Sequence, residues 1–154
     1  MFGHTPGGSY VPVPLDLNHG SQSLQIRRSR VGLVALWGLQ VVVAGLFLLA
    51  GGSKLAGAAA MVALFDAIGV GQWFRYVTGF IEVTGAVALL VPALAPFGAL
   101  LLALTMVGAI TTHLFIVGGS PVVPVFLLLG SLAILWARRD QLSGALSRLR
   151  RVRV

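Results

Sequence analysis

One apolar run near the N-terminus constrains the fold more than any other feature of the sequence. Residues 31–55 contain no charged side chain before Lys54. As a helix, this run is about 37 Å long, enough to cross a hydrocarbon core of about 30 Å with some tilt. The run therefore predicts a transmembrane helix.

The composition agrees with a membrane protein. Hydrophobic residues make up 57% of the 154 positions, and charged residues only 10%. A soluble domain of this size could not cover such a surface with polar groups. The apolar segments also use nearly the whole length, which leaves no room for a separate soluble catalytic domain.

Three further apolar segments follow, each bounded by glycine or proline, and predict spans over about 73–91, 97–117 and 122–137. The apolar stretch 58–68 is too short to span, so an interfacial or re-entrant helix is expected there. The predicted fold is therefore all-α: an antiparallel, integral membrane four-helix bundle with a short interfacial helix between helices 1 and 2.

The two ends of the chain differ from the middle. Residues 1–25 are polar and rich in glycine and proline, and they predict a flexible tail. Residues 26–137 form the expected transmembrane domain. The stretch 138–154 is basic, and its leucines recur at helical spacing, which indicates an amphipathic helix.

The positive charge is placed at the membrane flanks. Of 11 lysines and arginines, all but Lys54 and Arg75 lie in the segments 27–30 and 138–153. Because basic flanks collect on the cytoplasmic side, both termini are predicted to be cytoplasmic. The net charge of +7 then indicates contact with anionic lipid headgroups and not with nucleic acid.

Polar side chains inside the predicted spans point to a site, because a charge in hydrocarbon is costly and seldom kept without a role. The alternating chain direction brings Lys54, Glu82 and His113, on helices 1 to 3, into the outer half of the membrane. Gln40 shares a helix face with Lys54 at a seven-residue repeat, and Arg75 lies at the start of the second span. These five residues are the candidates for ligand binding or proton exchange.

Each candidate also has a structural explanation. A Lys54–Glu82 pair could only lock two helices together, Lys54 could extend to the headgroups, and His113 could bond a backbone carbonyl. The sequence contains no self-contained catalytic motif, so enzymatic activity and any catalytic residue stay open.

Small side chains in the spans indicate where helices approach each other closely. These positions are Gly45, Gly79, Gly85, Gly108 and Ala109.

Cofactor chemistry is limited by residue types. The chain has no cysteine, which excludes disulfides, iron–sulfur ligation and thiolate metal sites. His113 is the one histidine in a predicted span, which excludes a bis-histidine haem within one chain. No metal site and no intrinsic cofactor is predicted.

Four short motifs, in order and spread over about 31–137, resemble the DoxX-like membrane proteins. The first helix ends in a matching Gly-x-x-Lys-Leu pattern, and a short segment closing on glycine follows. A Gly-x-x-Glu-x-x-Gly-Ala segment and a methionine segment with a later histidine come next. The residues are Gly51–Leu55, Phe65–Gly69, Gly79–Ala86, and Met106–Ala109 with His113.

The resemblance implies a four-helix bundle in the bacterial cytoplasmic membrane, linked to redox or oxidative-stress systems. These include quinone-linked thiosulfate oxidation and complexes with superoxide dismutase. One hypothesis is a membrane subunit of a redox assembly, with a quinone or small apolar ligand between helices 1 to 3 and a soluble or membrane protein as partner. The alternative is a scaffold or a small-solute permeation element. The oligomeric state stays open.

Overall fold

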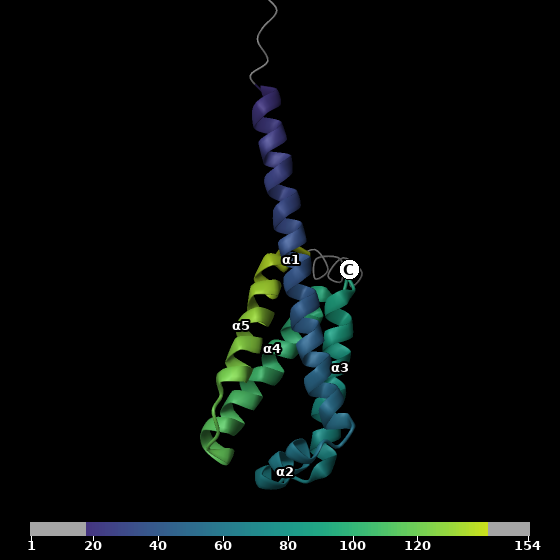
Figure 1. Cartoon of the computed structure of the whole chain (residues 1–154), viewed down its shortest axis with the longest axis vertical. Coiled ribbons are helices and arrows are strands. Elements are labelled where there is room, and N and C mark those ends of the chain that lie inside the picture. Colours follow the sequence, from purple (N-terminus) through teal and green to yellow (C-terminus); the bar gives the residue numbers. More distant parts are fainter. Residues whose placement is uncertain (1–17, 142–154) are drawn as a thin grey trace, which may run out of the picture. The chain divides into compact units, whose positions relative to one another are not determined.

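The computed structural model describes residues 18–141, with side chains from Val31 onward. This part of the chain is all-helical and has no strand. Its elements are α1 (Asn18–Leu55), α2 (Ala59–Ile68), α3 (Gln72–Leu90), α4 (Ala95–Thr112), the π-helix η1 (His113–Val117) and α5 (Val122–Ala137), and Figure 1 labels the five α-helices.

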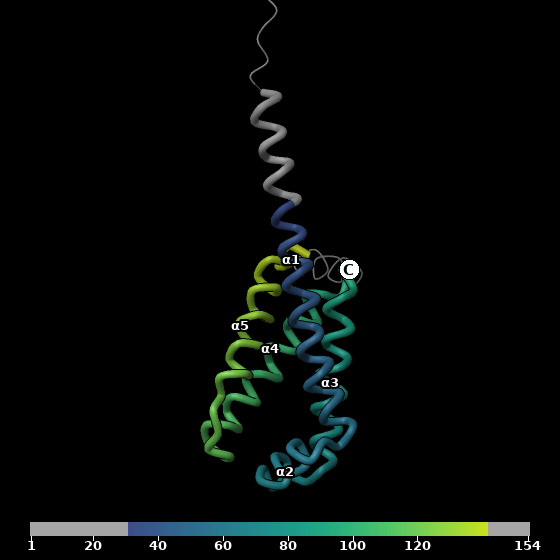
Figure 2. Tube along the Cα trace, viewed as in Figure 1, coloured from purple at the N-terminus to yellow at the C-terminus, as the bar shows by residue number. Residues whose placement is uncertain are grey.

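The chain divides into two units, Met1–Leu33 and Val34–Val154. In the first unit, the described residues belong to the N-terminal part of α1. Every contact reported below lies within the second unit. There α3 packs against α4 and α4 against α5, while α2 contacts both α3 and η1. Figure 2 shows the course of the chain through these helices.

Glycine and proline set several helix ends. α2 ends at Gly69, whose φ of 78° lies in the left-handed region and directs its N–H to the carbonyls of Phe65 and Asp66. Pro92 follows the end of α3. Pro96 lies in the first turn of α4, where a missing N–H costs little.

The first helix begins earlier than predicted. Residues 18–25 were expected in a flexible tail, but they are helical, so that prediction was wrong for them; residues 1–17 lie outside the described part. The stretch 21–30 has no glycine or proline and contains three arginines and two glutamines. A helix nucleated in the apolar run can therefore extend back through it.

The third predicted helix changes type before its end. Its α-helical part is α4, and the final turn, η1, is a π-helix that ends at Gly118. A π turn is wider than an α turn and redirects the side chains that follow, and such turns are frequent at functional sites. It begins at one of the candidate residues, His113.

Within residues 18–141, two helices are long and apolar enough to cross a membrane, Val31–Leu55 and Ala95–Val117. α3, which carries Arg75 and Glu82, is not among them, and neither is α5, which has only 16 residues. The full count of four spans and their antiparallel bundle therefore stay predictions. The short helix predicted at 58–68 is present as α2, and its interfacial or re-entrant position stays a prediction.

The end of α5 bears on the predicted amphipathic helix. α5 stops at Ala137, the helix is interrupted at Arg138, and it resumes over residues 139–141. Most of the predicted helix, residues 142–154, lies outside the described residues.

The core of the second unit lies between α1, α3, α4 and α5. Its buried hydrophobic residues are Val43, Ala44, Phe47, Ala86, Leu89, Ala99, Leu102, Met106, Leu127 and Ile134. Alanine is prominent among them, so the helix axes can lie close together.

Glycines lie at close helix crossings. A Cβ atom on Gly51 of α1 would lie 2.9 Å from the carbonyl oxygen of Gly79 on α3. One on Gly98 of α4 would lie 2.7 Å from the carbonyl oxygen of Gly85. The prediction of close approach was right for Gly79 and Gly85 but wrong for Gly45 and Gly108, where a Cβ atom would meet nothing within 4 Å.

Candidate functional site

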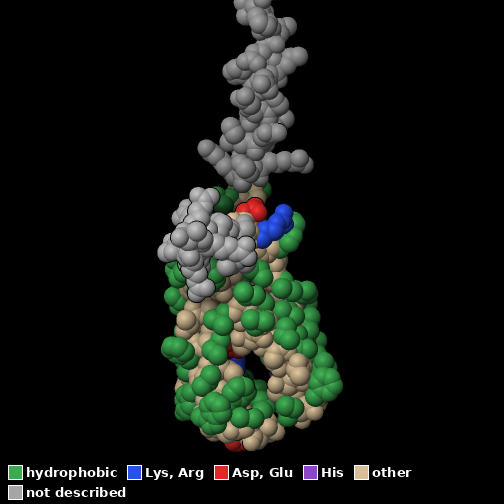
Figure 3. All heavy atoms as spheres, turned by 180° about the vertical axis from the view of Figure 1, so that it is seen from behind, with side chains coloured by type: hydrophobic (Ala, Val, Ile, Leu, Met, Phe, Trp, Pro, Cys, Tyr) green, Lys and Arg blue, Asp and Glu red, His purple; other side chains and the backbone are tan. Residues whose placement is uncertain are grey.

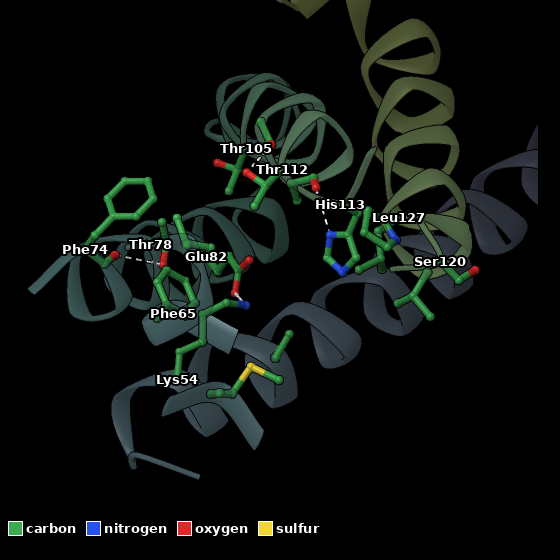
Figure 4. Close-up of a pocket in the computed structure, with 17 residues that line it drawn as sticks. Lys54, Phe65, Phe74, Thr78, Glu82, Thr105, Thr112, His113, Ser120 and Leu127 are labelled. Atoms are coloured by element: carbon green, nitrogen blue, oxygen red, sulfur yellow. Dashed lines mark hydrogen bonds and ion pairs between the residues drawn. The ribbon is translucent and has the colours of Figure 1, made fainter. Parts of the chain in front are cut away.

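A cavity of about 420 Å³ lies among the helices of the second unit. Its walls come from α1, α2, α3, α4, η1, the loop before α5, and α5 itself, and Figure 4 shows the lining side chains. The lining residues are Ala50, Lys54, Met61, Phe65, Ile68, Phe74, Thr78, Glu82, Thr105, Gly108, Ala109, Thr112, His113, Ser120, Val123, Pro124 and Leu127.

An ion pair forms the charged part of the wall. Lys54 Nζ of α1 donates to Glu82 Oε2 of α3 over 2.7 Å, and the two side chains are 13% and 3% exposed. The pair lies next to the Gly51–Gly79 crossing, where a Cβ on Gly79 would be 3.0 Å from Lys54 Cβ. The two glycines let the helices come close enough for the side chains to meet without a gap.

His113 reaches the cavity from the first position of η1. Its Nδ1 hydrogen-bonds the carbonyl oxygen of Ala109 over 2.9 Å. Figure 4 shows this ring on a different part of the wall from Lys54 and Glu82. The structure thus places the three predicted outer residues around one cavity, although His113 does not touch the ion pair.

Arg75 lies outside the cavity lining and supports it. It is 4% exposed, its Nη1 donates to the carbonyl oxygen of Lys54, and its Nε donates to Gln72 Oε1 over 2.6 Å. Gln72 in turn donates to Asp66 Oδ1 over 2.7 Å. A guanidinium at the C-terminus of α1 stabilises carbonyls that lack helical partners, so Arg75 fixes the backbone that carries Lys54.

Gln40 belongs to a separate polar cluster. It is fully buried, donates from Nε2 to the carbonyl oxygen of Leu89 over 2.7 Å, and accepts from Arg138 Nη2 over 2.7 Å. The seven-residue repeat puts it on the same face of α1 as Lys54. At about 1.5 Å per residue, however, the two lie about 21 Å apart along the helix. Gln40 therefore does not line the cavity.

The family comparison covers most of the chain. A model described as the DoxX-like family matches residues 38–137, well over half the sequence. The chain belongs to the DoxX-like family. This confirms the resemblance seen in the motifs. The searches of curated proteins and of solved structures gave no match.

The DoxX-like region contains the whole cavity and the five candidate residues. The cavity is wider than the predicted site between helices 1 to 3, because α2 and α5 also form its walls. Sequence reasoning missed Thr78, Ser120 and the α2 side chains Met61, Phe65 and Ile68. The α2 residues could have been found from one signal in the sequence: an apolar helix that is too short to span the membrane.

Arg138, one residue beyond the DoxX-like match, was also missed as a buried residue. It is 6% exposed, although sequence reasoning placed it in the basic flank. The signal was Gln40, a polar residue in a span that needed a partner. Among the described residues, no three histidine, aspartate or glutamate side chains gather as metal ligands would.

Proposed function

We propose that this DoxX-like protein is the multi-pass membrane subunit of a redox assembly and that its cavity holds a quinone or a similar small apolar ligand. The observation that carries the proposal is the cavity itself, with mainly apolar walls and an ion pair on one side. Ligand sites commonly have this character and a volume of about 300–1,000 Å³.

Exposed apolar side chains support four crossings of the bacterial cytoplasmic membrane. α3 exposes Trp73, Phe80 and Val87, and α5 exposes Phe126 and Leu129, while the charged Arg75 and Glu82 are buried. In Figure 3 hydrophobic side chains cover most of the described surface. Such a surface suits lipid and would be a liability in water.

The expected orientation follows from the basic flanks, with both termini on the cytoplasmic side. The cavity then opens in the outer half of the membrane. Figure 3 shows the described surface hollowed in its lower part, with basic and acidic side chains inside the hollow.

The chemistry of the wall suits a ligand with polar oxygens on an apolar ring. Lys54 retains N–H groups beyond the one bonded to Glu82, and these can donate to a ligand oxygen. Phe65, Phe74 and Leu127 provide apolar contacts for the ring. Because lysine and glutamate neutralise each other, the site favours a neutral ligand over an ion.

The test is ligand binding to the full chain in lipid nanodiscs. Bound lipophiles are extracted and identified by mass spectrometry, and a short-chain ubiquinone analogue is titrated into the empty protein. Gly108→Leu should fill the cavity, since Gly108 lines it and has open space at its Cβ position. We expect at least a tenfold loss of affinity with unchanged folding.

Gly45→Leu is the matched control, because Gly45 also has open space at its Cβ position but does not line the cavity. Its affinity should equal that of the original protein. If neither a quinone nor its hydroquinone is retained or bound, or if the two variants behave alike, the ligand proposal is wrong. A scaffold or small-solute permeation role would then take its place.

A further inference from the structure

The cavity wall offers more hydrogen-bond acceptors than donors. Thr78, Thr105 and Thr112 each donate their single hydroxyl proton to a carbonyl of their own helix. A threonine that has given its proton away can still accept but can no longer donate. These three wall residues therefore offer a ligand acceptors only.

His113 adds a further acceptor. A carbonyl oxygen can only accept, so the bond to Ala109 requires the proton on Nδ1. In the neutral ring Nε2 is then a bare acceptor. Within the described residues, Nε2 makes no hydrogen bond, and the ring lines the cavity.

The ion pair leaves groups of both kinds. Lys54 uses one N–H on Glu82 Oε2, while Glu82 Oε1 makes no hydrogen bond with any described residue. A carboxylate oxygen accepts and never donates. The remaining donors are thus the ammonium of Lys54 and the hydroxyl of Ser120, against a larger set of acceptors.

We propose that the cavity selects the hydroxyl-bearing, reduced form of its ligand: a hydroquinone over the corresponding quinone. This inference rests on the proposed function. A hydroxyl can accept from Lys54 and donate to Glu82 Oε1, and a second hydroxyl can donate to His113 Nε2. The carbonyls of a quinone can accept from Lys54 and Ser120, but they leave Glu82 Oε1 and His113 Nε2 without a donor.

The preference follows from the cost of an unmet acceptor. Sites built to bond a hydroxyl discriminate strongly against analogues that lack it, because the protein group is left desolvated and unpaired. We expect at least tenfold tighter binding of the hydroquinone. For a two-electron couple, tenfold tighter binding of the reduced form raises the reduction potential of the bound pair by about 30 mV.

The test compares three probes with one carbon skeleton: a short-chain hydroquinone, its quinone and its dimethyl ether. Affinities for the full chain in nanodiscs are measured anaerobically by equilibrium dialysis. The dimethyl ether retains oxygens that accept but has lost both donors. Hydroquinone should bind at least tenfold more tightly than either of the others.

A variant assigns the effect to the histidine. His113→Phe should weaken hydroquinone binding about tenfold and leave quinone binding unchanged. Thr111→Val is the control, because Thr111 is exposed, bonds the carbonyl of Val107 and does not line the cavity. It should retain both affinities.

Each outcome has one meaning. Equal binding of quinone and hydroquinone, or ether binding as tight as hydroquinone binding, overturns the selectivity and leaves the proposed function standing. Failure of the original protein to bind any of the three probes overturns both. The probe comparison uses the unaltered protein, so the inference stays testable even if His113→Phe does not fold.

Discussion

The Lys54–Glu82 pair has two charges inside a region where neither is tolerated alone. Each side chain supplies the countercharge of the other across the crossing of α1 and α3. Removing one partner leaves an uncompensated buried charge, whereas removing both leaves none. The pair can therefore be both a clamp between helices and part of the cavity wall.

We predict that Lys54→Met and Glu82→Gln each destabilise the protein. Each variant leaves the charge of the other residue unpaired, which costs about 3–5 kcal/mol. The double variant should recover much of the loss. Thermal unfolding in nanodiscs measures all three. Single-variant losses that simply add in the double variant would contradict a coupled pair.

The polar cluster of Gln40 and Arg138 should affect stability but not ligand binding. Gln40→Leu leaves the carbonyl of Leu89 and the guanidinium of Arg138 without their partner, and should cost about 1–3 kcal/mol of stability. Tryptophan fluorescence on heating reports this, since Arg138 stacks 5.8 Å above the Trp37 ring.

Ligand affinity separates this cluster from the cavity. Gln40 does not line the cavity, so Gln40→Leu should leave quinone affinity within about twofold of the original. A large loss of affinity without a loss of stability would show that Gln40 belongs to the binding site after all.

At the scale of the helices, contacts between backbones decide which glycines matter. α3 and α4 meet where Gly98 faces backbone atoms of Gly85 and Leu89, at 2.7 and 2.8 Å from an added Cβ. Backbone cannot rotate away as a flexible side chain can. The crossing therefore admits no side chain at position 98.

We predict that Gly98→Ala destabilises the protein by about 1–3 kcal/mol through overpacking. Gly45→Ala should be neutral or stabilising by up to about 1 kcal/mol, since alanine favours the helix and meets open space. Parallel thermal unfolding of the two variants checks both signs. Equal effects would contradict the crossing.

Some elements could be predicted from the sequence because the evidence for them is local. Runs of apolar residues, most of them bounded by glycine or proline, predicted the helices. Helix phase and chain direction predicted that Lys54 and Glu82 lie close together. The burial of Arg138 could not be found in this way, because it depends on Gln40, which is distant in sequence. The sequence also could not show that Gly98, and not Gly45, lies at a helix crossing, because this depends on how each helix is rotated about its axis.

At the scale of the whole molecule, the orientation in the membrane is testable because the chain has no cysteine. Single cysteines at Val70, between α2 and α3, and at Leu94, between α3 and α4, can be introduced without background. Both positions are exposed.

We predict that Val70→Cys reacts with a membrane-impermeant maleimide in intact cells. Leu94→Cys should react only after the membrane is made permeable. This pattern follows from cytoplasmic termini and alternating spans. Reaction of both positions from outside would contradict the orientation and the count of four spans.

The attachment of α1 to α3 at two places has a consequence for how the protein moves. Lys54–Glu82 joins the helices at one end, and Gln40 joins α1 to Leu89 at the other. By contrast, η1 has no buried residue and α2 has one, Phe65. Elements with so little buried surface open at low free-energy cost. We expect a lipophilic molecule to enter directly from the bilayer as α2 and η1 part, while α1 and α3 stay fixed as the stationary wall.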